Sequence, residues 1–340
     1  ATWPALGASI RTMRVAAIVH RHPARVSQFA CCTIDRVRIW PFLKWVGGKR
    51  QLLPILRRFY PGRLNRYYEP FLGSGAVFFD LAASGRLNGD GALLSDANAD
   101  LIACYRRVRC SLADVVAALD RLGAEHAVRG REAYLEVRDR RFNPMRAAWR
   151  EQGGDVDAYP SELAAMLIYL NRTGYNGLFR LNASGEFNVP PGRYDSPRVL
   201  NRTRLERAAA LLAAPGVRIE HGAFDHVVAD ARAGDFVYFD PPYVPLSRTA
   251  NFRGYTGRGF GEAQQSLLQR VVIELAARGV HVLLSNSVAP DVIALYEDHP
   301  AVASAGLRAW RVPARRAVNS RPERRGAVEE LVVSNVLRPS

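Results

Sequence analysis

The segment Asp240-Pro241-Pro242-Tyr243 is the stretch of the sequence best suited to chemistry. It follows an apolar, β-prone run at residues 236–239, so we expect it just outside the carboxyl end of a buried strand, where ligand sites of open α/β sheets lie. Consecutive prolines cannot extend the strand pairing and they stiffen its exit. The segment therefore offers a fixed carboxylate, a Pro241 carbonyl and the aromatic face of Tyr243. This combination suits a planar amine, which needs two acceptors and a stacking surface; a proline-rich turn without chemistry is the alternative.

A glycine loop forms the second candidate site. Glu69-Pro70-Phe71-Leu72-Gly73-Ser74-Gly75 stands between a predicted strand at 67–71 and a predicted helix at 76–83. Glycines let a ligand approach the backbone closely, and the start of a helix offers free N–H groups. Asp96 ends the next predicted strand, where an acid usually binds ribose hydroxyls. The third glycine of a dinucleotide fingerprint is absent, so we expect a smaller nucleoside ligand.

Lysine usage points to a third position. Of the 47 basic residues only Lys44 and Lys49 are lysines, and both lie within Phe42-Leu43-Lys44-Trp45-Val46-Gly47-Gly48-Lys49. In a chain that otherwise uses arginine, this pattern indicates a site that needs a compact ammonium rather than a planar guanidinium.

Two segments combine arginine, asparagine and aromatic residues. The first covers 171–180 and 185–194, and glycines divide it into short turns. Such side chains can read base edges and insert between base steps, although a polar surface hairpin has a similar composition. The second, Ser247 to Phe260, is interpreted as a mobile cationic flap over the site, with a solvated loop as the alternative.

Composition restricts the class of protein. The formal net charge of +15 favours a polyanionic partner, and nucleic acid is the usual one. The four cysteines show no metal-ligand spacing, so neither a zinc site nor a disulfide framework is expected. No apolar run reaches the roughly 18 residues of a membrane span. These features favour a cytoplasmic protein without a metal.

An alternation of strands and helices begins at Pro41 and predicts a doubly wound α/β fold. Residues 125–205 interrupt it and are expected to form an inserted, mostly helical subdomain. Residues 1–38 are arginine-rich and lack periodicity, so they are expected to be a disordered extension or a segment upstream of the true start. Further predicted elements are helices at 52–59, 99–109, 112–122, 131–141, 161–171 and 262–278, strands at 92–95, 217–221, 236–239 and 280–285, and a hairpin at 310–336 with a connection at 315–325.

Six segments together resemble the Dam-type, D12-class DNA adenine-N6 methyltransferases. In chain order they are Lys-Trp-Val-Gly-Gly-Lys, Glu-Pro-Phe-Leu-Gly-Ser-Gly, Ser-Asp-Ala-Asn-Ala-Asp, Asn-Arg-Thr-Gly-Tyr-Asn-Gly-Leu-Phe-Arg, Gly-Glu-Phe-Asn-Val-Pro and Asp-Pro-Pro-Tyr. The resemblance runs from about Phe42 to the C-terminus in the α-group order, and Phe179 departs from it because small residues are common at that position.

The resemblance implies a Rossmann-like, seven-stranded methyltransferase sheet formed by residues 39–124 and 206–340, with a target-recognition subdomain at 125–205. It implies S-adenosylmethionine as cofactor, double-stranded DNA as substrate and no obligate protein partner, in a bacterial or phage-encoded enzyme. The adenine would be flipped out of the duplex, within GATC, and methylated at N6. Cofactor-binding residues would be Trp45, Lys49, Glu69, Phe71, Gly73, Gly75, Asp96 and Asp240. Catalytic residues would be Asp240, Pro241 and Tyr243. DNA-binding residues would be Arg172, Tyr175, Asn176, Leu178, Arg180, Pro190 and Tyr194.

Two alternatives stay open from the sequence. An enzyme of the same fold could act on cytosine N4, because an Asp-Pro-Pro-Tyr site serves either amine. A non-catalytic, basic DNA-binding protein with a vestigial cofactor site is the other.

Overall fold

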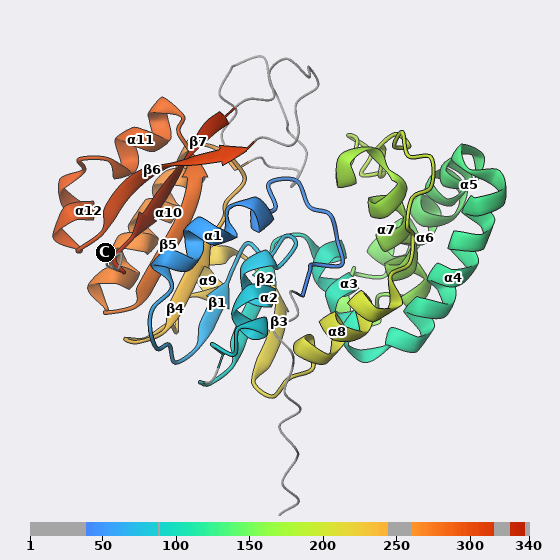
Figure 1. Cartoon of the computed structure of the whole chain (residues 1–340). Helices are drawn as coiled ribbons and strands as arrows, with labels where there is room; N and C mark the ends of the chain where they lie inside the picture. The colour runs from blue at the N-terminus through green and yellow to red at the C-terminus, as the bar shows by residue number, and fades with distance from the viewer. Residues whose placement is uncertain (1–38, 88, 244–259, 316–326, 337–340) are drawn as a thin grey trace, which may run out of the picture. The chain divides into compact units, whose positions relative to one another are not determined.

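The computed structural model describes residues 39–87, 89–243, 260–315 and 327–336 (Figure 1). The predicted extension at 1–38, the flap up to residue 259 and most of the connection at 315–325 therefore lie outside the described residues.

Within the described residues, seven strands form one sheet in the order β3-β2-β1-β4-β5-β7-β6. Their bounds are β1 Tyr67–Glu69, β2 Ala92–Asp96, β3 Val217–His221, β4 Phe236–Phe239, β5 His281–Ser287, β6 Arg308–Arg315 and β7 Ala327–Ser334. The first five run parallel, and β7 is antiparallel to both β5 and β6. This arrangement confirms the predicted seven-stranded α/β sheet and the predicted C-terminal hairpin.

Strand alternation divides the core into two layers, because successive side chains point to opposite faces of a sheet. Tyr67, Phe236, Tyr238 and Leu283 share one core with helices α1 (Leu53–Leu56), α2 (Ala76–Ala83) and α3 (Ala99–Cys110). Tyr68, Val237, Phe239 and Leu284 share the other with α9 (Phe224–Val227), α10 (Glu262–Ala277), α11 (Pro290–Tyr296) and α12 (Pro300–Ser304). The same alternation predicts on which face of the sheet a polar residue at the end of a strand lies.

Several predicted elements have different bounds. The predicted helix at 52–59 is instead the short helix α1, with Pro54 at its start, followed by a 3-10 turn at Arg57–Phe59. Another 3-10 turn, Lys49–Gln51, precedes α1. Strand β1 ends at Glu69 rather than residue 71, because Pro70 cannot donate to the ladder. The helix predicted at 131–141 becomes α5 (Arg131–Glu136), a π-helical segment (Val137–Phe142) and α6 (Asn143–Glu151).

The inserted region is mostly helical, as predicted. Helix α4 (Leu112–Arg129) packs on α7 (Ser161–Thr173), whose side chains are buried from Leu163 to Asn171. Figure 1 shows α4 to α7 gathered beside one another. A buried ion pair joins α6 to α3, with Arg146 Nη2 2.8 Å from Asp100 Oδ2. Helix α8 (Arg202–Leu212) then leads back to β3. Residues 36–340 form one compact unit, so the division at 125 and 205 stays a prediction.

Candidate active site and nucleic-acid interface

Asp240 lies directly after β4, on the side of the sheet that Phe236 and Tyr238 face. Its side chain is 19% exposed, and Oδ1 lies 2.8 Å from the ammonium of Lys49. The same oxygen accepts a hydrogen bond of 3.2 Å from Ser285 Oγ, which in turn lies 2.8 Å from the Tyr238 hydroxyl. The carboxylate is thus held by groups from β4, β5 and the turn before α1.

Burial raises the pKa of Asp240 to about 6, while the charge of Lys49 and its hydrogen bond act in the opposite direction. At neutral pH the group is therefore an anion that accepts hydrogen bonds. Lys49 itself is 4% exposed and also donates to the Gly47 carbonyl at 2.6 Å.

Tyr243 completes this corner of the site. Its hydroxyl donates to Glu330 Oε2 at 2.7 Å, and the Lys49 ammonium lies 4.5 Å from its ring centroid. Pro241 is buried, and Tyr243 is partly buried. The structure therefore brings the three predicted catalytic residues together, with an anionic acceptor beside an aromatic face.

The glycine loop packs against the segment that carries Trp45. Gly73 has a φ of +46° and Gly75 a φ of +66°, conformations that favour glycine. A Cβ on Gly73 would lie 2.8 Å from Trp45 Cδ1, so only glycine allows this close approach. The peptide N–H of Gly73 donates to Asp96 Oδ2 at 3.1 Å, and Asn98 N–H donates to Oδ1 at 2.9 Å. Loop, Trp45 and Asp96 form one local unit.

Glu69 is held by hydrogen bonds, and Phe71 lies among other aromatic rings. The buried Glu69 accepts hydrogen bonds from the Tyr67 hydroxyl at 2.9 Å and from the Phe78 N–H at the start of α2 at 3.0 Å. Burial raises its pKa to about 8. Phe71 lies in an aromatic cluster, 5.2 Å from Phe224 and 5.6 Å from Phe260 between ring centroids.

The three carboxyl groups around the glycine loop favour a cationic ligand. Burial raises the pKa values of Glu69 to about 8, of Asp96 to about 6 and of Asp240 to about 6, and Glu69 is raised further by the other two acids. A positive charge bound between them would stabilise their ionised forms. In addition, the buried Ser95 Oγ has no hydrogen-bond partner within the described residues. A nucleoside that carries a sulfonium and an ammonium group fits these residues.

The predicted recognition segment follows α7 as a strained turn. Tyr175 is 38% exposed, Asn176 has a φ of +54°, and Gly177 has a φ of +66°. A Cβ on Gly177 would lie 2.4 Å from Lys44 Cβ, so glycine is required where this turn meets the Lys44 segment. The Tyr175 N–H donates to the Pro190 carbonyl at 2.9 Å. The turn therefore presents the Tyr175 ring outward on a fixed backbone.

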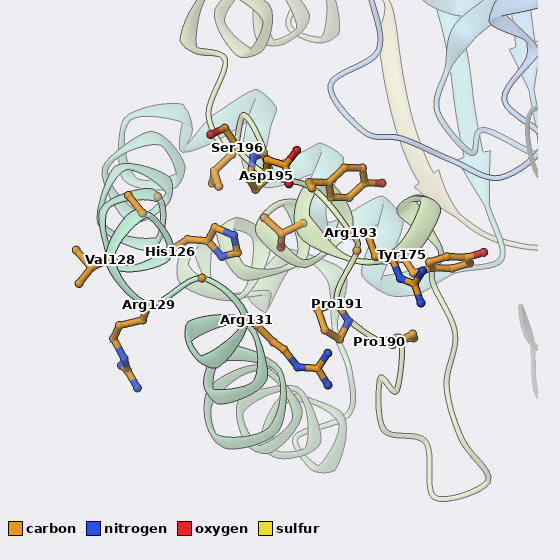
Figure 2. Close-up of a pocket in the computed structure, with 18 residues that line it drawn as sticks. His126, Val128, Arg129, Arg131, Tyr175, Pro190, Pro191, Arg193, Asp195 and Ser196 are labelled. Atoms are coloured by element: carbon orange, nitrogen blue, oxygen red, sulfur yellow. The ribbon is translucent and has the colours of Figure 1, made fainter.

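A cleft of about 1250 Å³ lies beside this turn. It is lined by the end of α4, the start of α5 and residues 190–197. In Figure 2, Tyr175 and Arg193 project to the same side of the loop with Pro190 and Pro191, whereas Arg129 points away from it.

Arg180 is oriented by its own hairpin. Its Nε donates to Asn188 Oδ1 at 2.7 Å and its Nη2 to the Asn188 carbonyl at 3.2 Å. The neighbouring Leu178 is partly buried. Phe179, the departure from the family pattern, is only 3% exposed and lies between Trp45 and Phe187, with centroid distances of 6.1 and 5.7 Å. Phe179 therefore packs the recognition hairpin against Trp45.

Four basic residues gather next to the recognition turn. Lys44 Nζ donates to the Arg172 carbonyl at 3.3 Å and lies 4.3 Å from the Tyr194 ring centroid, and Arg172 Nε donates to the Arg198 carbonyl at 3.2 Å. The pKa of Arg172 is lowered by burial and by the charges of Arg204 and Arg198. Among the described residues, no acid contributes to the pKa shifts of Lys44, Arg172 or Arg204. We call Lys44, Arg172, Arg198 and Arg204 the cation group.

The sequence motifs did not include three residues of the candidate active site: Tyr238, Ser285 and Glu330. Each lies on a strand whose local sequence resembles any other buried strand. The signal that could have found them is alternation, because Tyr238 and Asp240, Ser285 and Leu283, and Glu330 and Val332 each share a face.

No helix among the described residues is long and apolar enough to cross a membrane. No group of three or more histidine, cysteine, aspartate or glutamate side chains in this part of the chain has the arrangement needed for a metal ion.

Comparisons with known proteins identify the family. The model of the D12 class N6 adenine-specific DNA methyltransferases matches residues 45–309. The chain is 35% identical over 302 residues to the type II methyltransferase M1.LlaDCHI of Lactococcus lactis subsp. cremoris, covering 88% of this chain and 97% of that protein. It is 35% identical over 310 residues to the type II methyltransferase M.MjaIII of Methanocaldococcus jannaschii, covering 88% of this chain and 100% of that protein. It is 35% identical over 245 residues to a DNA adenine methylase of Salmonella typhimurium, covering 72% and 80%. The chain therefore belongs to the D12 class of N6 adenine-specific DNA methyltransferases, which use S-adenosylmethionine.

Proposed function

We propose that this DNA adenine-N6 methyltransferase acts on double-stranded DNA at GATC sites and flips the target adenine out of the duplex. The observation that carries the proposal is the juxtaposition of Asp240, Pro241 and Tyr243 beside the glycine loop, with the recognition turn joined to the same assembly through Lys44 and Trp45. Relatives at about 35% identity include proteins named DNA adenine methylase.

Base flipping follows from the depth of the acceptor. Adenine N6 is paired inside a duplex, and Asp240 is mostly buried, so the two can meet only if the base leaves the stack. Tyr175, exposed on its strained turn, has the position and shape to fill the gap that the base leaves.

The proposed chemistry uses residues of this chain as acceptors and as a platform. S-adenosylmethionine supplies an electrophilic methyl group when bound. Asp240 and the Pro241 carbonyl accept the two N6 hydrogens, which localises the nitrogen lone pair that is otherwise delocalised into the ring. Tyr243 stacks on the adenine and fixes its plane. No covalent enzyme intermediate is required, so positioning and electrostatics provide the rate enhancement.

Cofactor binding is assigned to the residues around the glycine loop. Gly73 and Gly75 allow close approach of the methionine portion, with Phe71 and Glu69 behind them, and Asp96 accepts from the ribose. Trp45 packs on Gly73, and Lys49 controls the charge of Asp240. The raised pKa values of the three acids support this assignment, because a sulfonium offsets the burial that raises them.

DNA recognition is assigned to the 125–205 subdomain. Asn176, Leu178, Arg180 and Pro190 lie on or beside the strained turn and hairpin, and Arg180 presents a guanidinium suited to the O6 and N7 atoms of guanine. Arg172 and Tyr194 belong to the surface around the cation group and are assigned to contacts with DNA. A cytoplasmic location in a bacterial or phage-infected cell is part of the same proposal.

The decisive experiment incubates the purified protein with S-adenosylmethionine and duplexes that contain GATC or each of its single-base variants. Mass spectrometry of the nucleosides separates N6-methyladenine from N4-methylcytosine, and sequencing locates the modified base. N6-methyladenine confined to GATC supports the proposal, whereas methylation of other sites removes the GATC assignment. Replacing the target adenine with 2-aminopurine tests flipping, which predicts increased fluorescence on binding. An unchanged signal in a complex that forms would contradict flipping.

A further inference from the structure

Glu330 lies outside the family match at 45–309 and contacts two residues of the active site. Its Oε2 accepts the Tyr243 hydroxyl at 2.7 Å and lies 3.9 Å from the Lys49 ammonium, and the side chain is 20% exposed. None of the sequence motifs included this residue. Its position next to Asp240 is a product of the C-terminal hairpin.

The register of the hairpin explains this position. β7 pairs antiparallel with β5, so that Ser287 is opposite Glu330 and Ser285 is opposite Val332. Residues two apart share a face, which places Glu330 on the face where Ser285 donates to Asp240. Glu329 points to the other face and is exposed. The chain therefore carries a matched pair of neighbouring glutamates, one at the site and one away from it.

Lys49 occupies the place that the substrate needs. Its ammonium lies 2.8 Å from Asp240 Oδ1 and 4.5 Å from the Tyr243 ring centroid. A target amine that binds Asp240 through Oδ1, with its ring on the face of Tyr243 that Lys49 covers, would displace the ammonium from both positions. A displaced ammonium that is 4% exposed needs another anion, since an unpaired buried charge is costly. Glu330 is the carboxylate within reach.

We propose that Glu330 is a positioning residue for methyl transfer. It fixes the Tyr243 ring through the hydroxyl and receives Lys49 when the target amine takes its place on Asp240. This inference rests on the proposed role of Asp240 and Tyr243 in binding a flipped adenine. Glu330 itself does not touch the base.

The test combines a mutant cycle with a pH profile. Single-turnover methylation is measured for Glu330→Ala, Tyr243→Phe, the double variant and the control Glu329→Ala, at saturating S-adenosylmethionine and DNA. Glu330→Ala and Tyr243→Phe should each slow methyl transfer on the order of 10-fold to 100-fold, the scale of a misplaced reacting group. The double variant should be no slower than the slower single variant, and Glu329→Ala should match the wild type.

The pH profile provides a readout that a purely structural role would not move. Because the Glu330 charge repels the Asp240 carboxylate, Glu330→Ala should shift the acid limb of the single-turnover rate to lower pH. The proposal would be overturned if the rate losses of the two single variants multiply in the double variant. It would also be overturned if Glu330→Ala matches Glu329→Ala in its rate and in the pH of its acid limb.

Folding and function are controlled separately. If circular dichroism finds Glu330→Ala unfolded, Tyr243→Phe decides, because it removes the same hydrogen bond and keeps Glu330; a wild-type rate for it would refute the inference. All rates are ratios to the wild type on the duplex that the wild type methylates best. Failure of the GATC assignment would therefore appear in the wild type alone and leave the ratios intact.

Discussion

Lys49 Nζ lies 2.8 Å from Asp240 Oδ1, although one residue precedes α1 and the other follows β4. In the enzyme without DNA, this contact pairs the negative charge of Asp240, the proposed hydrogen-bond acceptor, with a positive charge. A buried carboxylate without a partner would be protonated more readily and would accept hydrogen bonds poorly. Lys49 thus favours the ionised form of Asp240 at neutral pH.

Asp240→Asn is expected to abolish methyl transfer. Asparagine keeps the shape but presents an NH2 group and no charge, so it loses an acceptor for the amine. The loss should be ~10²-fold or more in kcat, as for other groups that act mainly in the transition state. Turnover with duplex DNA is the measurement, and the exposed Asp291→Asn is the control. Turnover of Asp240→Asn within a few-fold of the wild type would exclude the proposed acceptor.

The acid limb of kcat/KM is expected near pH 6, the pKa to which burial raises Asp240. Activity should fall as the pH drops through this value, because the protonated group accepts poorly. Lys49→Gln removes the charge that lowers this pKa, so its acid limb should lie at higher pH than that of the wild type. The measurement compares the pH at which the acid limb lies in the wild type and in Lys49→Gln, not their absolute rates. An unmoved limb, or one at lower pH, would argue against titration of Asp240.

The sequence was sufficient for the sheet, the glycine loop and the Asp-Pro-Pro-Tyr corner, because those signals are local: a strand pattern followed by residues that end a strand. It was not sufficient for Ser285 and Glu330, whose roles depend on strand order and on the register of an antiparallel hairpin. Nor did it show that Glu69 receives the Phe78 N–H and is deeply buried. Such roles arise from the pairing of strands that are far apart in the sequence. A single sequence indicates this pairing only through the alternation of buried and exposed residues along each strand.

Helix bounds failed for physical reasons of the same kind. Pro54, at the start of α1, and the 3-10 turn Arg57–Phe59 shorten what periodicity predicted as one helix at 52–59. The π-helical segment at Val137–Phe142 shifts the helix register. Tyr134 of α5 and Arg138 of the π-helical segment hold the recognition hairpin: Tyr134 OH and Arg138 Nη1 donate to the Val189 carbonyl at 2.9 and 3.0 Å. Tertiary contacts overrode local preference in this region.

Glu69→Gln is expected to change the pH dependence of stability. The folded protein holds the Glu69 proton with a pKa of about 8 against 4.5 as the ordinary value. The group's stabilising contribution is therefore fully present below pH 4.5 and is lost as the pH rises toward 8. Glutamine carries no such proton, so the melting temperature of Glu69→Gln relative to wild type should increase from pH 5 to pH 8. The measurement uses protein without cofactor. A constant difference across this range, as expected for exposed Glu329→Gln, would show that Glu69 ionises normally.

The cation group is expected to contact DNA phosphates. Arg204 and Arg202 lie two residues apart on α8, but Arg202 pairs with Asp120 at 2.7 Å whereas Arg204 faces other cations. Arg204→Gln should weaken binding to all duplexes alike and reduce the salt slope by about 1. Arg202→Gln is the matched control and should leave the slope nearly unchanged. The affinity is measured from 50 to 200 mM salt. Equal slopes for wild type and Arg204→Gln would remove this residue from the interface.

Arg180 is expected to read one base pair. Asn188 holds its guanidinium through two hydrogen bonds, which reduces the freedom that a bidentate contact with guanine would otherwise remove. Arg180→Ala should cost ~1–3 kcal/mol at that base pair and relax discrimination there. Arg180→Lys keeps the charge and loses the planar fork, so it should restore binding to mixed-sequence DNA but not discrimination.

The pattern of loss separates base reading from backbone contact. Methylation rates on GATC and on each single-base variant are compared among wild type, Arg180→Ala, Arg180→Lys and Asn188→Ala at fixed salt. Asn188→Ala should show a smaller loss of discrimination at the same base pair, because the guanidinium remains but is less well oriented. If Arg180→Ala keeps the wild-type preference ratios and loses rate uniformly, the residue contacts phosphate. If all four proteins prefer another sequence equally, the adenine chemistry stands and the recognition assignment for this hairpin fails.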